Sequence, residues 1–168
     1  MDEPVTQAPP PRIRVLLLDD DHFMLELLTD MLADLGNSGG GAGGGVAAFE
    51  VRTESDARRA LASLALDPPA LLICDLSMPD MDGIEFMQAA AAAGFGGGVM
   101  LLSGMDSGVR KAAERLARAH GLNVLGAFKK PISALELQAA LGPLLGPAQD
   151  PDAPGHENLY NPSPVSGK

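Results

Sequence analysis

LLICDLSMPDMDG, residues 71–83, joins a strongly apolar segment to a turn. The apolar residues at its start suit a buried strand, and Asp75 follows them directly. A carboxylate is expensive to bury unless something compensates its charge. A strand that opens into a turn would instead place Asp75 at the rim of a sheet, where ligand sites are built in parallel α/β folds. The stretch therefore predicts a strand that ends at a site.

Strand-like and helix-like segments alternate on both sides of this stretch. Apolar runs predict strands at 13–18, 46–53, 70–75, 98–103 and 123–128. Helical spacing and terminal residues predict helices at 23–36, 55–66, 84–93, 108–120 and 133–145, with Gly36 ending the first, Ser55 capping the second and Ser133 opening the last. Strands that are apolar along their whole length indicate a parallel sheet covered by helices on both faces. Because crossovers are right-handed, the expected fold is an α/β doubly wound sheet.

The overall composition limits the class of protein. A chain of 168 residues suits one compact domain. It has 12 lysines and arginines against 22 acids, and the net charge of -10 argues against nucleic-acid binding, which needs clustered basic residues. The acidity itself is best interpreted as a source of solubility. The single cysteine, Cys74, rules out an internal disulfide bond.

The two ends and one internal segment differ in composition from the rest. Residues 1–11 and 147–168 are rich in proline and polar residues, and we expect both to be disordered. This leaves 12–146 as the expected domain, with a glycine-rich loop insertion at 37–45. The first residues lack the regions of a signal peptide, so the sequence predicts a cytoplasmic protein. The longest uncharged run, 86–105, is interrupted by glycines and predicts a helix end, a turn and a strand rather than a membrane span.

Polar residues stand at the carboxyl ends of four predicted strands. They are Asp19 and Asp20 after the first strand, Asp75 at the end of the third, Ser103 at the end of the fourth and Lys130 after the fifth. Carboxylates gathered at one rim repel one another unless a cation lies among them, and oxygen ligands suit Mg²⁺. A lysine ammonium and a serine hydroxyl beside that ion would bind the oxygens of a phosphoryl group. The set therefore predicts a magnesium-dependent phosphoryl site.

Each of these residues has a plainer explanation when taken alone. The acids can cap a helix, Ser103 can belong to a turn, and Lys130 can be a solvated side chain. None of these explanations accounts for all of them falling at the same edge of one sheet. We therefore interpret them as one site.

Four segments that carry these residues resemble a known family. They are VLLLDDD (15–21), ICDLSMPDMDG (73–83), LLSG (101–104) and FKKP (128–131). In this order and at these separations they resemble the receiver domain of bacterial two-component response regulators, over roughly residues 12–145. The resemblance implies a (βα)5 flavodoxin-like sandwich with strand order 2-1-3-4-5.

The resemblance also implies a role for each acidic residue. Asp75 would be the phosphoacceptor, taking a phosphoryl group from a histidine kinase or a histidine phosphotransfer protein. Mg²⁺ would be bound directly by Asp20, Asp75 and the backbone carbonyl of Ser77, with Asp19 assisting through water. Lys130 would pair with a phosphoryl oxygen. Such a protein is not an enzyme beyond its own phosphorylation and dephosphorylation.

The resemblance assigns the signal to the loop after the fourth strand. Ser103 would turn to bond the phosphoryl group and shift this loop, while Gly104 leaves access and Met105, with Ser77, lies where the family tunes dephosphorylation. The peptide bond between Lys130 and proline would be cis. Output would come from binding an unidentified partner around the fourth helix, fifth strand and fifth helix. Whether the chain forms a homodimer is left open.

The other residues of 71–83 are expected to have structural roles. Asp80 and Asp82 should shape the turn and start the next helix rather than bind metal. Gly83 would admit the close approach of that helix. Cys74 is expected to be a small buried apolar residue rather than a reactive thiol.

One position departs from the family pattern. Three residues before the lysine, receivers usually carry an aromatic residue that turns inward on activation, but here Ala127 occupies that position and Phe128 follows it. An aromatic switch is therefore not expected. The segment GLNVLGAFKKPI, residues 121–132, is similar to receivers that precede EAL-type cyclic-di-GMP phosphodiesterases. Because only a proline-rich tail follows residue 145, we expect either a stand-alone receiver or the excised receiver of a longer protein.

Two other functions remain as alternatives. Haloacid-dehalogenase-type phosphatases also use a strand-end aspartate, a later serine or threonine, a lysine and Mg²⁺, and here Asp19 would be the nucleophile with Asp21 as acid and base. That interpretation leaves the motif around Asp75 unexplained and finds no acidic pair after Lys130. The other alternative is a receiver-like scaffold that binds partners without phosphorylation. The complete acidic set, together with Ser103 and Lys130, argues against it.

Overall fold

The computed structural model describes residues 12–38, 48–79 and 81–145, and there five strands alternate with five helices. The elements are β1 (Arg12–Leu18), α1 (His22–Ser38), β2 (Ala48–Glu54), α2 (Ala57–Leu66), β3 (Leu71–Asp75), α3 (Gly83–Ala92), β4 (Gly98–Ser103), α4 (Ser107–Ala119), β5 (Asn123–Lys129) and α5 (Ala134–Leu145). The predicted alternation is confirmed. The segments expected to be disordered, and most of the glycine-rich insertion, lie outside the described residues.

The strands form one parallel sheet in the order β2-β1-β3-β4-β5, as predicted. The chain moves from β1 outward to β2, then returns to β3 on the other side of β1, so the winding reverses between β1 and β3. Leu18 pairs with Cys74 across these two strands, which sets the residues that follow side by side. This reversal is the place where α/β sheets bind ligands.

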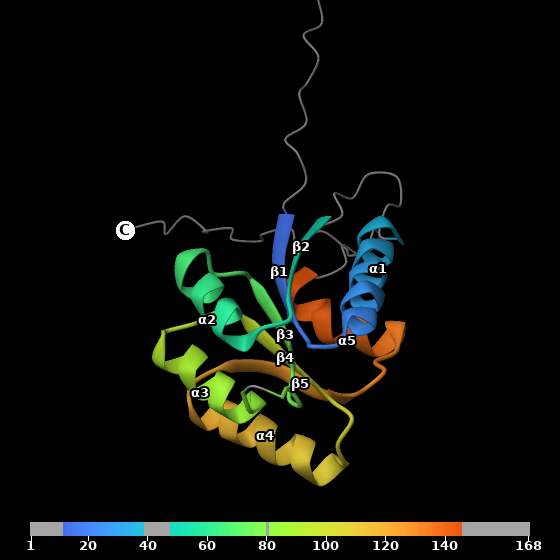
Figure 1. Ribbon diagram of the computed structural model, residues 1–168. Coiled ribbons are helices and arrows are strands. Elements are labelled where there is room, and N and C mark those ends of the chain that lie inside the picture. The colour runs from blue at the N-terminus through green and yellow to red at the C-terminus, as the bar shows by residue number, and fades with distance from the viewer. Residues whose placement is uncertain (1–11, 39–47, 80, 146–168) are drawn as a thin grey trace, which may run out of the picture.

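Helices cover both faces of the sheet. Figure 1 shows α1 and α5 on one side and α2, α3 and α4 on the other. Strand β3 is buried along its whole length because its side chains alternate between the two layers. Ile73 packs in the layer of α1 and α5 with Leu28 and Leu137. Leu72 packs in the opposite layer with Phe86 of α3. This double burial explains the continuous apolar run in the sequence.

Two predicted helix ends were wrong. Helix α1 continues through Gly36 to Ser38, so Gly36 lies inside the helix and does not form the left-handed cap that ends one. Helix α2 is capped by Asp56 instead of Ser55, since the Asp56 carboxylate accepts the backbone N–H of Arg59 at 2.9 Å. At the last helix the prediction holds: Ser133 accepts the backbone N–H of Glu136 at 3.2 Å, and the Glu136 carboxylate accepts both the N–H and the hydroxyl of Ser133.

The uncharged run 86–105 divides into three parts, as predicted. It contains most of α3, a turn, and β4. Gly94 in the turn has φ of 77° and donates its N–H to Ala91, a backbone conformation that side chains with a Cβ rarely adopt. Among the residues that the structure describes, no helix is long and apolar enough to cross a membrane.

Candidate functional site

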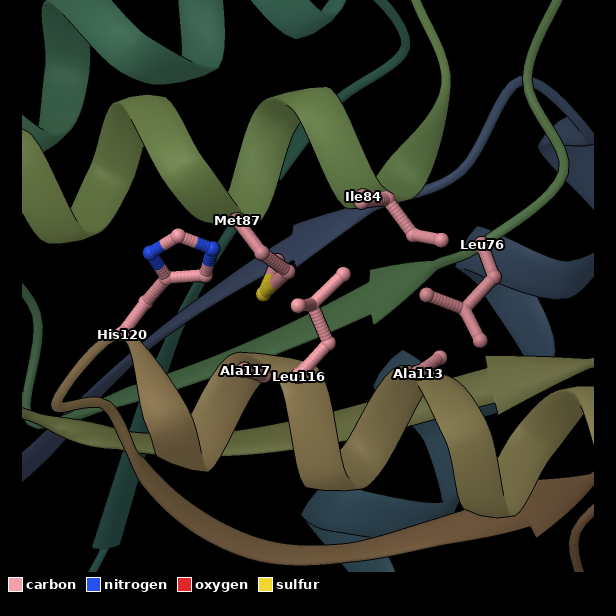
Figure 2. A pocket seen from close by; sticks show the side chains of 7 residues that line it. All are labelled: Leu76, Ile84, Met87, Ala113, Leu116, Ala117 and His120. Carbon is pink, nitrogen blue, oxygen red and sulfur yellow. The ribbon is translucent and has the colours of Figure 1, made fainter.

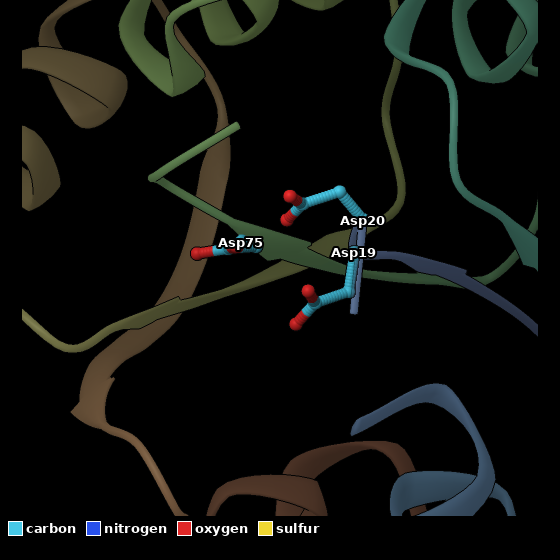
Figure 3. Close-up of side chains that lie close together, drawn as sticks. All are labelled: Asp19, Asp20 and Asp75. Carbon is cyan, nitrogen blue, oxygen red and sulfur yellow. The ribbon is translucent and has the colours of Figure 1, made fainter. Parts of the chain in front are cut away.

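The carboxyl ends of β1 and β3 bring three carboxylates together. Asp19 and Asp20 follow β1, and Asp75 is the last residue of β3; Figure 3 shows the three side chains at this edge of the sheet. One oxygen from each lies within 4.8 Å of the other two. Asp19 and Asp75 are only 2% and 3% exposed, whereas Asp20 is exposed. Two of the acids are therefore held away from water, and the third faces it.

Lys130 reaches the two buried acids from the end of β5. Its Nζ lies 2.6 Å from Asp19 Oδ2 and 2.9 Å from Asp75 Oδ2. The backbone fixes its position, because the Lys130 N–H donates to the carbonyl of Ser103 at 2.9 Å. The Lys130–Pro131 peptide bond is cis, as the sequence predicted. The ammonium group of Lys130, which follows β5, thus contacts carboxylates at the ends of β1 and β3.

Both carboxylate oxygens of Asp75 have a partner in the structure. Oδ1 accepts the backbone N–H of Ser77 at 3.0 Å, and Oδ2 faces Lys130. The neighbouring backbone is fixed as well, since the Leu76 N–H donates to Leu102 of β4 at 2.9 Å. Burial raises the pKa of Asp75 above its ordinary value, although the Ser77 N–H and Lys130 oppose the rise. Burial alone would lower the pKa of Lys130, but the carboxylates of Asp19 and Asp75 together raise it. Lys130 therefore stays charged at neutral pH.

Negative charge exceeds positive charge within this group. Three carboxylates face one ammonium, and among the described residues Asp19 Oδ2 has no directed hydrogen bond despite its close ion pair with Lys130. Buried charge of one sign is unfavourable unless a counter-ion balances it. Oxygen donors of this kind, with room for water beside the exposed Asp20, fit Mg²⁺. The residues present are thus a suitable metal site.

Ser103 lies beside this group but faces the loop after β4. It is fully buried, and its Oγ accepts the backbone N–H of Met105 at 2.9 Å. A hydroxyl that accepts one bond can still donate its own proton to a new partner. The next residue, Gly104, is exposed, and a Cβ built there would meet no heavy atom within 4 Å. A larger side chain at position 104 would therefore extend into open space.

Other residues of the motif have structural roles. Asp82 is the N-cap of α3 and accepts the N–H of Ile84 at 3.1 Å, as predicted. Asp80 lies outside the described residues. Cys74 is buried, and this burial raises the pKa of its thiol, in agreement with the inert role expected of it. A Cβ on Gly83 would lie 2.6 Å from the Leu76 Cα, so glycine is needed where α3 approaches the loop.

The residues before Lys130 lie on opposite faces of β5. Ala127 packs in the layer of α2, α3 and α4, whereas Phe128 packs in the layer of α1 and α5. Phe128 therefore points away from the β4–α4 side, which agrees with the expected lack of an aromatic switch. A strand pattern alone could show that the two residues alternate, but not which of them faces α4.

The order of these residues agrees with a known sequence family. The sequence model of one family, the response regulator receiver domain, matches residues 15–142 of this chain. The chain belongs to the response regulator receiver family. Receivers exchange phosphoryl groups with histidine kinases or phosphotransfer proteins, act on output domains and use Mg²⁺, and as a class they are not enzymes.

Individual relatives agree with this assignment. The receiver is 30% identical over 135 residues to the probable chemotaxis protein CheY of Rhizobium etli, covering 80% of this chain and 94% of that protein. It is 35% identical to a crystal structure of a response regulator from Colwellia psychrerythraea, with a TM-score of 0.62 over 79% of this chain and 95% of that one.

A third relative fits the predicted similarity to receivers linked to phosphodiesterases. The cyclic di-GMP phosphodiesterase RocR of Pseudomonas aeruginosa is 38% identical over 71 residues. The match covers 42% of this chain but only 18% of RocR. The likeness is thus to a small part of that protein, and its phosphodiesterase activity is a property of RocR.

Proposed function

We propose that this receiver is a phosphoacceptor whose acceptor residue is Asp75. In the reaction, a carboxylate oxygen of Asp75 forms a bond to phosphorus as the P–N bond to the donor histidine breaks, and the imidazole of the donor keeps the electron pair. The supporting observation is the setting of Asp75, a nearly buried strand-end carboxylate between the Ser77 N–H and the Lys130 ammonium. These contacts orient the nucleophile before any donor arrives.

The neighbouring residues have separate tasks in this proposal. Asp20 and Asp75, with the backbone carbonyl of Ser77, would hold Mg²⁺ directly, and Asp19 would assist through water. The pairing of Asp19 with Lys130 and the exposure of Asp20 support this division. When bound, Mg²⁺ supplies positive charge that offsets the charge on the phosphoryl oxygens. Lys130 is close enough to move from the Asp75 carboxylate to one of these oxygens.

Ser103 would convert phosphorylation into a change of shape. Its side chain would rotate so that the hydroxyl donates to a phosphoryl oxygen, and this rotation would break the bond that the hydroxyl now accepts from the Met105 N–H. The β4–α4 loop would then lose one of its restraints, and the population would shift toward a second arrangement of this loop. Output partners that favour this arrangement would bind the phosphorylated receiver more tightly. The receiver would catalyse only its own phosphorylation and dephosphorylation.

The phosphatase alternative fits the geometry poorly. Asp19 Oδ1 accepts the N–H of Asp21 at 2.9 Å and Oδ2 faces Lys130, which are the same kinds of contact that Asp75 makes, so the chemistry required of Asp21 decides between the two alternatives. Asp21, the supposed acid and base, accepts the N–H of Phe23 at the start of α1. Both residues are thus explained by helix capping and ion pairing.

A direct test is the formation of an aspartyl phosphate. The protein is incubated with acetyl phosphate or phosphoramidate and Mg²⁺, and a hydroxylamine-labile adduct is measured by intact mass. We expect an adduct in the wild type and in the control Asp82→Asn, and none in Asp75→Asn. An unchanged adduct in Asp75→Asn would contradict the proposal. An adduct that depends on Asp19 and is accompanied by rapid turnover of a metabolite would favour the phosphatase, and no adduct in a folded wild type would favour the scaffold.

Location and domain limits stay predictions. We expect the receiver to act in the bacterial cytoplasm, where a histidine kinase or phosphotransfer protein supplies the phosphoryl group. The proposed domain is 12–146, and this segment expressed alone should unfold with the same free energy as the whole chain.

A further inference from the structure

The loop between β4 and α4 is anchored at both ends. At its start, the carbonyl of Ser103 accepts the backbone N–H of Lys130 at 2.9 Å. At its end, Asp106 is the N-cap of α4, and its carboxylate accepts two backbone N–H groups of the first helical turn. Only Gly104 and Met105 lie between these anchors. A change in the course of the loop is therefore confined to these two residues.

Hydrogen bonds rather than apolar packing hold this part of the loop. Gly104 is exposed and has open space around its Cα, and Met105 is 40% exposed. The N–H of Met105 donates to Ser103 Oγ at 2.9 Å, and its carbonyl accepts the guanidinium of Arg110. The two bonds act on the two peptide groups that flank Met105. Together they fix the φ and ψ angles of this residue, which set the course of the loop.

Arg110 lies where the helix itself gains nothing from a cation. It is near the start of α4, where the helix dipole already places positive charge. It also shares one helix face with Ala113 and Ala117, at i, i+3 and i+7, and Figure 2 shows the side of α4 that carries these two alanines turned toward α3. Arg110 is half-buried, whereas residues 104–109 are exposed. Its position is therefore explained by its bond to Met105.

The two ends of this bond belong to different parts of the molecule. The backbone of Arg110 is fixed in α4, since its N–H donates to the carbonyl of Asp106 at 3.2 Å and the inner face of the helix packs in the core. The carbonyl of Met105 belongs to the loop. When Ser103 turns away, the guanidinium is the remaining restraint on Met105. A new course of the loop changes the angles of Met105 and carries its carbonyl away from Arg110.

We propose that Arg110 is a positioning residue, which holds the Met105 carbonyl in the resting arrangement of the loop and releases it when Ser103 turns to the phosphoryl group. The bond then stabilises only the resting arrangement. Its strength sets how many unphosphorylated molecules already have the second arrangement. The link to phosphorylation rests on the proposed function, whereas the restraint itself is a property of the unphosphorylated protein.

The test uses the full chain and beryllofluoride with Mg²⁺, which mimics the phosphoryl group, and follows binding by amide NMR. Arg110→Met keeps the length of the side chain and removes the guanidinium. It should bind beryllofluoride about fivefold more tightly than the wild type, because more of the unbound molecules have the second arrangement. Arg110→Lys keeps a charged donor and should return the Kd toward the wild-type value. Mg²⁺ alone should bind all three proteins equally, since Arg110 is not a proposed metal ligand.

Two comparisons separate this role from a general effect of charge or stability. Arg118→Met removes the same charge from the other end of α4 and should leave the Kd for beryllofluoride within about 1.5-fold of the wild type. In Ser103→Ala no hydroxyl favours the second arrangement, so adding Arg110→Met should change the Kd by less than about 1.5-fold. An unchanged or weaker Kd in Arg110→Met, an equal gain in Arg118→Met, or an equal gain in the Ser103→Ala background would each overturn the proposal.

A second measurement needs no phosphoryl mimic. Exchange of the Met105 amide hydrogen with water, measured by saturation transfer, should be about fivefold faster in Arg110→Met and unchanged in Arg118→Met. If beryllofluoride binds no variant but this exchange still rises, the proposed function fails and the restraint stands. If beryllofluoride binds every variant with the same Kd, the positioning role fails alone. Lower stability of Arg110→Met in urea without either change would assign Arg110 a structural role and refute the inference.

Discussion

Replacing Lys130 by methionine removes the ammonium between two buried carboxylates and keeps most of the side-chain volume. In the structure, Nζ lies 2.6 Å from Asp19 Oδ2 and 2.9 Å from Asp75 Oδ2. Both acids are nearly inaccessible to water, so solvent cannot take the place of the lysine. We expect the metal-free variant to be much less stable than the wild type.

Two limits set the size of this effect. At these separations, an effective dielectric constant near 20 gives a gross attraction of about 6 kcal/mol for each pair, part of which offsets the desolvation of the charges. Protonation of a carboxylate sets a lower upper limit on the loss of stability, because it removes the unpaired buried charge. A carboxylate with the ordinary pKa of 3.8 can be protonated at pH 7 for about 4 kcal/mol. Removing one partner of a buried ion pair commonly costs about 3–5 kcal/mol. We therefore expect a loss of about 3–4 kcal/mol in the free energy of unfolding at pH 7.

The sign of the pH dependence follows from the same reasoning. Without Lys130, the folded chain disfavours the charged carboxylates, so their pKa is higher in the folded state than in the unfolded state. Such groups destabilise the folded chain as pH rises above the unfolded pKa, and the loss shrinks as pH falls toward it. At pH 5 the cost of protonation, and with it the expected loss, is about 1.6 kcal/mol. Mg²⁺ should also stabilise the variant more than the wild type, because it replaces part of the missing charge.

Urea unfolding followed by circular dichroism measures these differences at pH 7 and pH 5, with and without Mg²⁺. Lys129→Met is the matched control, because Lys129 is exposed and its replacement should change the free energy of unfolding by less than about 0.5 kcal/mol. If Lys130→Met is as stable as Lys129→Met at pH 7, or if its loss is the same at pH 5, the reasoning is refuted. Should the variant fail to fold at pH 7, recovery at pH 5 or with Mg²⁺ is still expected.

Four further predictions concern packing, helix capping and thiol reactivity. Gly83→Ala should lower the free energy of unfolding by about 1–3 kcal/mol, because its Cβ would lie 2.6 Å from the Leu76 Cα. Gly142→Ala, where a Cβ meets nothing within 4 Å, should raise it by about 0.4–1 kcal/mol, and equal effects of the two changes in urea unfolding would contradict the packing argument. Asp56→Ala removes the N-cap of α2 and should lower the free energy of unfolding by about 1 kcal/mol. An unchanged free energy of unfolding would show that the cap contributes nothing. The buried thiol of Cys74 should react with Ellman's reagent only as fast as the chain unfolds, so rapid reaction of the folded protein would reveal local opening of β3.

The elements and the strand ends could be predicted because their signals are local. The apolar run at 98–103 coincides with β4, and the run before Asp75 forms β3. Parallel strands with right-handed crossovers place all their carboxyl ends at one edge. Asp75, Ser103 and Lys130 could therefore be assigned to the same edge without coordinates, although they are far apart in the sequence.

The ends of helices were less predictable because neighbouring residues compete for the same role. Ser55 and Asp56 are both good N-cap residues, and only the path of the chain after β2 places the Asp56 carboxylate on the N–H of Arg59. Gly36 is a common terminal residue, but it caps a helix only if the backbone takes a positive φ there, and α1 continues past it.

By itself, the sequence determined the alternation of elements, the sheet and the set of polar residues at its edge, because these depend on periodicity and connectivity. Tertiary structure alone decided which of the two acids after β1 pairs with Lys130. Asp19 and Asp20 are adjacent in sequence, yet Asp19 is buried against the lysine and Asp20 faces water. Tertiary structure also packed Met87 of α3 against Ala113 and Ala117 of α4. The physical reason is that periodicity identifies the buried face of each element, whereas distances between side chains of different elements are set by how those faces pack.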